Sequence, residues 1–213
     1  ELEEGIRSSK DMTEEEMLKL RALRAFFYGS VTLGEHLPLV SYLRSRDVRF
    51  TRVCEKMVKE GLKHPLFKSN VEWLLDISRN EWHASEEDAE KYIANIENQK
   101  ALLNDSMFVK LNTGFLARIY MNKEQYNAYY EVLRKAIMEL DTTINESVLD
   151  ELINICKERN YLVKCLQGIN DTTQINFNVS DETLGILKSA NFINEFHNAK
   201  NGVSLEINKT TAE

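Results

Sequence analysis

A row of basic residues in the first third of the chain has the spacing of one helical face. Its five members recur at intervals of three or four residues: Arg49, Arg52, Lys56, Lys59 and Lys63. Because residues three and four apart lie on the same side of an α-helix, we expect one positively charged surface, called here the basic row. Guanidinium and ammonium groups bind phosphate, an acidic partner or another domain. The alternative is a solvated helix face, in which Glu55 and Glu60 dilute the positive charge.

A histidine and two glutamates, His83, Glu86 and Glu87, have the spacing of metal ligands on one helical turn. However, Ser85 is a favoured N-cap, which places His83 outside the helix that follows. The acidic side chains are then explained by the positive end of the helix dipole. A stable site would also need further ligands, and the sequence identifies none. We therefore predict no metal site in this chain.

The thiols offer no catalytic arrangement. The chain has three cysteines, Cys54, Cys156 and Cys165, an odd number without paired spacing. This favours a reducing compartment over a disulfide framework, so we expect a cytoplasmic protein. No histidine is paired with them in the sequence, and glycine-rich phosphate loops, GxSxG elbows and HExxH motifs do not occur. We assign no catalytic and no cofactor-binding residue, and we expect the chain to be non-catalytic on its own.

Tyrosines and histidines complete the polar candidates. Four tyrosines lie close together in the sequence: Tyr120, Tyr126, Tyr129 and Tyr130. An apolar ring with a polar tip can line a ligand pocket, but at helical spacing such residues more often pack in a core, and we favour packing. The isolated histidines His36, His64 and His197 are interpreted as surface or structural residues.

Composition places the chain among globular helical proteins. Of its 213 residues, 43% are hydrophobic and 29% are charged, which argues against wholesale disorder. Two prolines and eight glycines are few, and this favours long helices. The net charge of −7 argues against nucleic acid as a partner. No apolar run reaches the roughly 18–20 residues that span a bilayer, so we expect no membrane partner.

Apolar periodicity predicts a series of helices. They are expected at residues 12–27, 37–46, 47–61, 66–77, 85–103, 123–140 and 146–158. For the first, Thr13 and Glu16 fit a capping box, and Gly29 with Ser30 should end the helix. Asp47 is the expected cap of the third. Residues 107–121 could form either a β-hairpin or a helix broken at Gly114.

The last quarter of the chain has a different pattern. Short strands are expected at residues 161–166, 175–179 and 203–207, with a helix at 181–188 and a turn at Asn201–Gly202. We therefore predict a mainly α fold, a multi-helix bundle with a small β-containing C-terminal appendage. The expected division is a helical domain at 1–158 and a small α+β appendage at 159–213.

The opening of the chain resembles a known family. The runs ELEEGI at residues 1–6 and DMTEEEMLKLRAL at residues 11–23 are similar to the exit from the barrel of cobalamin-binding radical SAM enzymes. In that family a similar passage leads into a helical C-terminal domain. The chain begins with Glu1 rather than Met, so we interpret it as part of a longer polypeptide. The resemblance covers about the first thirty residues, and the family's CxxxCxxC and cobalamin-binding motifs do not occur in this chain.

Two functions follow from these observations. The resemblance implies an accessory domain that packs on a catalytic barrel and helps to enclose substrate. The iron–sulfur cluster, S-adenosylmethionine and cobalamin would then belong to the parent protein. The alternative is a helical protein–protein interaction module, regulatory or adaptor-like, that uses the basic row. The expected partner is accordingly a catalytic domain of the same polypeptide or another protein.

Overall fold

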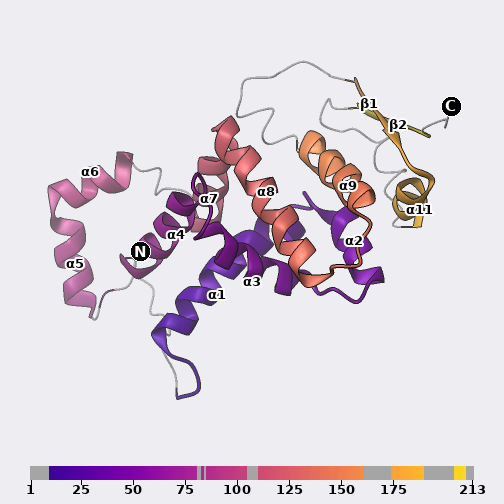
Figure 1. Ribbon diagram of the computed structural model, residues 1–213. Helices are drawn as coiled ribbons and strands as arrows, with labels where there is room; N and C mark the ends of the chain where they lie inside the picture. Colours follow the sequence, from indigo (N-terminus) through magenta and orange to yellow (C-terminus); the bar gives the residue numbers. More distant parts are fainter. Residues whose placement is uncertain are drawn as a thin grey trace.

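The protein is mainly α-helical, with a small β element near its C-terminal end, as the sequence predicts (Figure 1). The computed structural model describes residues 10–80, 83, 85–104, 110–160, 174–189 and 204–209. The helices are α1 (Glu14–Phe27), the π-helix η1 (Tyr28–Thr32), α2 (Leu37–Ser45), α3 (Phe50–Gly61), α4 (Lys68–Asn80), α5 (Glu86–Ala94), α6 (Ile96–Asn104), α7 (Leu111–Tyr120), α8 (Lys123–Leu140), α9 (Glu146–Arg159) and α11 (Asp181–Ser189). The strands are β1 (Gln174–Val179) and β2 (Ser204–Lys209).

Local sequence signals fix the ends of several helices. The capping box of α1 is present: the Thr13 hydroxyl accepts from the Glu16 N–H, and the Glu16 carboxylate accepts from the Thr13 N–H. Asn122 and Asn145 cap α8 and α9 through their side-chain oxygens. The predicted bounds of α8 are confirmed at both ends.

Three predicted boundaries are wrong. Gly29 and Ser30 do not end the first helix, because the backbone continues into η1 and Leu33 N–H donates to the Tyr28 carbonyl. Asp47 does not cap α3: it has a φ of 59°, and α3 follows Arg49, whose side chain makes no cap bond. The helix expected at 85–103 is broken at Asn95, whose side chain caps α6.

The ambiguous stretch is helical in its described part. Residues 111–120 form α7, and Gly114 lies within the helix rather than in a turn. The Trp73 ring lies beside this glycine, 3.6 Å from where a Cβ would stand. An aromatic side chain of α4 thus packs against the position where the sequence pattern suggested a break.

The core lies where α1, α3, α4, α7 and α8 meet. Four fully buried rings occupy its centre: Phe26, Phe67, Phe115 and Tyr129. The Phe26 ring lies 5.1 Å from Phe115 edge to face, and 6.2 Å from both Phe67 and Tyr129, measured between ring centroids. These are the distances of favourable aromatic packing, so one ring of α1 joins α7, α8 and the turn before α4.

A close approach at the end of α3 requires a glycine. A Cβ added to Gly61 would lie 2.9 Å from Val71 Cγ2 and 3.1 Å from Phe67 Cδ1, both buried. We expect Gly61→Ala to lower the free energy of unfolding by about 1–3 kcal/mol, since these packed side chains must move. Gly185→Ala on α11 is the control, because nothing lies within 4 Å of its added Cβ. Urea denaturation monitored by circular dichroism checks this, and equal stability of the two variants would contradict the packing described.

The C-terminal element is a βαβ arrangement on the side of the helical body. β1 and β2 pair in parallel with Gln174 opposite Ser204, so α11 lies within the connection between them. Ser180 donates to the Glu151 carboxylate of α9, and Asn145 donates to Glu182 of α11. The predicted strand at 161–166 and turn at Asn201–Gly202 lie outside the described residues.

Candidate functional site

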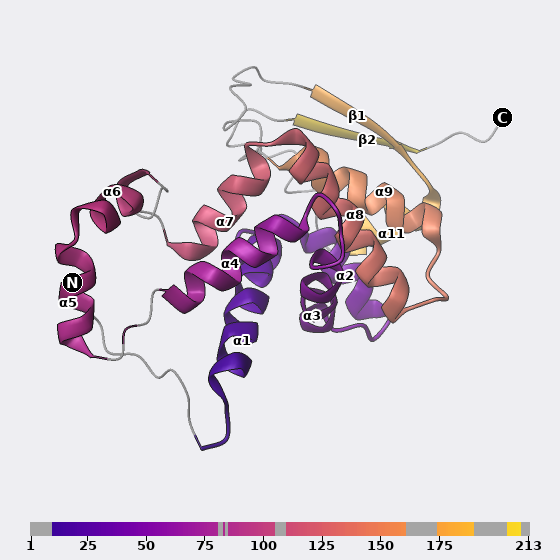
Figure 2. The same cartoon turned by 60° about the vertical axis from the view of Figure 1, so that its left-hand side comes forward.

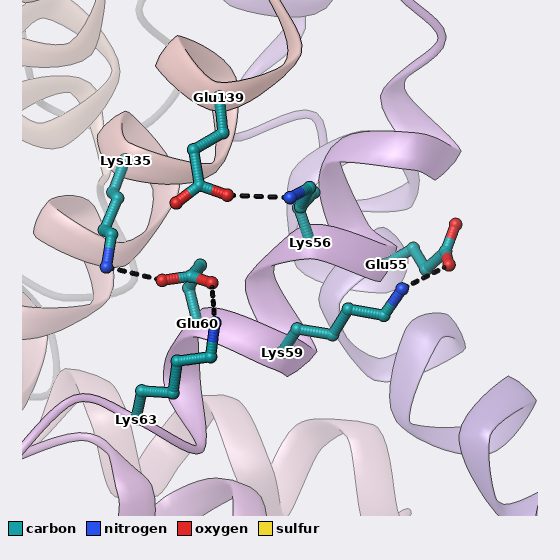
Figure 3. A network of polar contacts seen from close by, with 7 residues as sticks. All are labelled: Glu55, Lys56, Lys59, Glu60, Lys63, Lys135 and Glu139. Atoms are coloured by element: carbon teal, nitrogen blue, oxygen red, sulfur yellow. Dashed lines mark hydrogen bonds and ion pairs between the residues drawn. The ribbon is translucent and has the colours of Figure 1, made fainter.

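Three of the five basic-row side chains are bound to acidic residues of the same chain at close range (Figure 3). Lys56 lies 2.7 Å from Glu139 of α8, Lys59 lies 2.9 Å from Glu55, and Lys63 lies 2.6 Å from Glu60. Arg52, Lys56 and Lys59 lie within α3, whereas Arg49 precedes it and Lys63 follows it. The sequence indicated that Glu55 and Glu60 dilute the positive charge, but not that Glu139 approaches from α8.

Glu60 is the centre of this network. Its carboxylate keeps only 2% of its surface exposed and also binds Lys135 of α8 at 2.5 Å. Hydrogen bonds from Lys135 and Lys63 lower the pKa of Glu60. A buried carboxylate is costly unless it is paired, and here two cations supply the pairing. This part of the basic row therefore holds α3 against α8.

The N-terminal end of the row has a different environment. Arg49 is exposed and makes no ion pair with any residue that the structure describes, and the same holds for Arg44 at the end of α2. Arg46, which lies between them, is bound instead to Asp141 at 2.5 Å and to Thr143 at 2.8 Å. Arg52 lies 3.8 Å from Glu55 and is exposed. The available positive charge is therefore concentrated where α2 turns into α3.

This turn encloses a small pocket, called here the α2–α3 corner. Its volume is about 230 Å³, and its lining is Val40, Arg44, Asp47, Val48, Arg49 and Phe50. Asp47 in the left-handed region reverses the chain, and the N–H groups of Asp47 and Val48 donate to the carbonyls of Arg44 and Leu43. Apolar side chains, two arginines and one carboxylate, that of Asp47, thus line one depression, which keeps an excess of one positive charge.

No family model, curated protein or solved structure matches the chain. The chemistry of the α2–α3 corner is therefore judged from its own residues. An apolar lining with two guanidinium groups suits an aliphatic side chain flanked by carboxylates.

A second group of polar residues is buried beside η1. The Tyr120 hydroxyl donates to the Glu35 carboxylate, and burial raises the pKa of Glu35 to about 7, although hydrogen bonds from Tyr120 and Asn160 oppose the shift. The π-helix positions this carboxylate: Glu35 N–H donates to the Gly29 carbonyl. A Cβ on Gly29 would lie 3.3 Å from the Glu35 carboxylate and 2.9 Å from Leu116. Glu35 could not be found from the sequence, since a lone glutamate belongs to no helical pattern and no motif.

His36 follows directly and is fully buried. Its Nε2 shares a hydrogen bond of 3.2 Å with the Tyr130 hydroxyl, and its ring stacks 5.8 Å from Tyr129. Burial lowers the pKa of His36 to about 3, and the positive charge of Arg159 adds to the effect. Of the two predicted roles of His36, surface or structural residue, the structural one is confirmed.

The four tyrosines pack in the core, as favoured from the sequence. All are buried, and successive rings of Tyr120, Tyr126 and Tyr130 contact edge to face at 5.6 and 5.1 Å. The Tyr126 hydroxyl donates to the Lys157 carbonyl at 2.7 Å, which joins α8 to α9. These side chains fill space between helices, and their hydroxyl groups are hydrogen-bonded to other buried or partly buried residues.

A larger depression of about 480 Å³ lies between α8 and α9, with Tyr130 in its lining. Its charged groups are bound to one another: Arg134 pairs with Asp150 at 2.6 Å and with Glu146 at 2.7 Å. Lys157 donates to the Asn127 side chain at 2.6 Å. Its cations are thus already neutralised or hydrogen-bonded, and the depression selects no particular ligand charge.

The remaining candidates of the sequence analysis are separate from these sites. The His83 ring lies 4.8 Å from Tyr92, and Ser85 caps α5 as expected. Within the described residues no group of three or more histidines, cysteines or carboxylates has the arrangement of a metal site. Burial raises the pKa of Cys54 and of Cys156 to about 12, so neither is a ready nucleophile. Cys165 and His197 lie outside the described part.

None of the helices in the described part of the chain is both long enough and apolar enough to span a bilayer.

Proposed function

We propose that the chain is a helical protein–protein interaction module whose α2–α3 corner binds an acidic segment of a partner. The partner is either another protein or a catalytic domain of the same polypeptide. One observation carries the proposal: Arg44 and Arg49 line the same apolar pocket and make no ion pair with any described residue. In the rest of the basic row, Lys56, Lys59 and Lys63 are held by internal carboxylates.

The apolar pocket adds binding energy and selectivity that exposed charges alone do not provide. A solvent-exposed ion pair contributes only about 0–1 kcal/mol, so two arginines by themselves give weak and unselective binding. An aliphatic side chain that enters the depression adds roughly 1.5–3 kcal/mol through burial. Val40, Val48 and Phe50 provide the apolar lining for it. The preferred ligand is therefore an acidic segment with one aliphatic anchor.

The radical SAM accessory domain stays a prediction. Residues 1–9, which begin the resemblance, lie outside the described part, and no observation at the site favours that family. The iron–sulfur cluster, S-adenosylmethionine and cobalamin of a parent protein are predictions of the same kind. Both functions require a docking surface on the helical body, and the α2–α3 corner serves either.

Charge reversal tests the corner directly. We expect Arg44→Glu/Arg49→Glu to weaken binding of a fluorescent peptide of alternating Glu and Ile by at least about tenfold, since two attractive contacts become repulsive. Fluorescence anisotropy measures this. The free energy of unfolding should change by less than about 0.5 kcal/mol, because both side chains are exposed. Reversal of Lys56 would be less informative, because it also breaks the pair with Glu139.

The matched control is Lys123→Glu, an exposed lysine in the first turn of α8. It changes the net charge in the same direction, and a carboxylate is tolerated at a helix N-terminus. We expect it to bind the peptide like the unaltered protein, apart from a small loss of long-range attraction. Equal weakening by the control and the corner variant would contradict a site at the α2–α3 corner. A peptide with Lys in place of Glu should bind neither the unaltered protein nor the control variant, because both keep the arginines of the corner.

A further inference from the structure

Two short helices, α5 and α6, form an arm (residues 85–104) that stands apart from the helical body in both views (Figures 1 and 2). Within α5 only Ala89 is buried, whereas Ile93 and Ile96 keep 44% and 64% of their surface exposed. The side-chain amides of Asn98 and Gln99 donate to main-chain carbonyls of α5. The arm therefore has a defined bend, and it presents aliphatic side chains to the outside.

The arm also carries excess negative charge. Residues 86–104 contain five acidic and two basic side chains. Both lysines are ion-paired with a glutamate one turn earlier on their own helix, at 2.7 and 2.8 Å. The lysines therefore leave the charge of Glu86, Asp88 and Glu90 on α5 largely uncompensated.

One face of α5 matches the ligand that the α2–α3 corner suits. Glu86, Glu90 and Ile93 are spaced at i, i+4 and i+7, which places them in line along one side of the helix. Two carboxylates are thus followed by an aliphatic side chain that is nearly half exposed. The corner offers the complement, two guanidinium groups beside an apolar depression.

The arm and the corner lie far apart within one molecule. In both views α1 and α4 lie between α5 and the turn that joins α2 to α3 (Figures 1 and 2). A contact between these two surfaces therefore requires two molecules. We propose that α5 of one molecule binds the α2–α3 corner of a second copy, with Ile93 in the pocket and Glu86 and Glu90 against Arg44 and Arg49.

This inference rests on the proposed function, because it names the acidic segment that the corner receives. The contact joins two different surfaces, so two molecules joined by one such contact keep one free arm and one free corner between them. Such contacts continue into rings or open filaments, or close as a dimer when each of two molecules places its arm in the corner of the other. Because charge attraction contributes to the contact, added salt should weaken it.

The test uses two full-length variants that each lose one side of the contact. Arg44→Glu/Arg49→Glu removes the corner and keeps the arm, whereas Glu86→Lys/Glu90→Lys removes the arm and keeps the corner. In sedimentation velocity we expect the unaltered protein to associate with rising concentration, and each variant alone to stay monomeric. An equimolar mixture should associate, because the unaltered arm of the first variant meets the unaltered corner of the second, and the lysine-bearing arm meets the glutamate-bearing corner. Both contacts are attractive only between unlike variants, so the two variants should alternate in the assemblies that form.

Ile93→Ser provides a second variant that keeps all charges of the arm, and it too should reduce association. Circular dichroism of every variant checks that the helices are retained. A protein that stays monomeric at all concentrations, or a mixture of the two variants that fails to associate, overturns the proposal. If the Glu–Ile peptide still binds the corner in that case, only the second-copy partner is wrong. If neither the peptide nor a second copy binds, the proposed function fails as well.

Discussion

Phe26→Ala should lower the free energy of unfolding by about 3–5 kcal/mol, because it removes a fully buried aromatic ring from the centre of the core. The ring contacts Phe67, Phe115 and Tyr129, which come from three other parts of the chain. Each partner loses packing on one side, and the rigid surroundings can close the cavity only in part. Urea denaturation followed by circular dichroism measures the change.

The matched control lies on the same helix. Leu20→Ala removes a side chain of α1 that is 46% exposed, and we expect a loss of no more than about 0.5–1 kcal/mol. If Phe26→Ala proves too unstable to purify, Phe26→Leu leaves a smaller cavity and should lie between the two. A Phe26→Ala variant as stable as Leu20→Ala would contradict the central position of this ring.

Much of the fold could be predicted because its signals are local. The capping box of Thr13 and Glu16 indicates the start of α1, and apolar residues at helical spacing indicate the bounds of α8. The wrong boundaries arise where tertiary contacts override local preference. Gly114 favours a break, yet the neighbouring Trp73 ring packs on it within a continuous helix. Asp47 is of a residue type favoured as a helix cap, but it is the left-handed residue of a turn.

The candidate site could be predicted only in part. The spacing of the basic row correctly indicates one face of α3, but it contains no information about which carboxylates approach from α8. Glu139 and Lys135 of α8 reach Lys56 and Glu60 of α3 only through helix packing, across some eighty residues of sequence. Lys59 and Lys63, in contrast, are paired locally with Glu55 and Glu60 one turn away. The buried pair of Glu35 and His36 likewise depends on Tyr120 and Tyr130, which are distant in sequence.

Glu35→Gln should stabilise the protein relative to its parent by an amount that increases with pH. The pKa of Glu35 is about 7 in the folded chain, against an ordinary value of 4.5. Between these values folding takes up a proton, so the stability of the parent falls as the pH rises from 4.5 through 7. A glutamine cannot titrate and can still accept from the Tyr120 hydroxyl. The stability difference should therefore grow by about 3 kcal/mol between pH 4.5 and pH 8.

Glu72→Gln is the control for this experiment, because Glu72 is exposed on α4 and is bound only loosely, at 3.4 Å, by Lys68. Its effect should stay within about 0.5 kcal/mol. Urea midpoints measured across the pH range provide both differences. Parallel profiles for Glu35→Gln and the parent would show that this carboxylate titrates in the folded chain as it does in the unfolded one.

The titration of His36 has the opposite effect on stability. Glu35 and His36 together therefore shape how the stability of the unaltered protein depends on pH. The folded chain holds His36 neutral, with a pKa of about 3 against 6.5, so its contribution is lost as the pH falls through that range. Between pH 4.5 and 6.5 the slopes of Glu35 and His36 have opposite signs and cancel. Glu35→Gln removes one slope, so its stability should rise with pH up to about 6.5. His36→Phe, which keeps a ring beside Tyr129, should instead lose stability from pH 4.5 to 7, because Glu35 alone then titrates on folding.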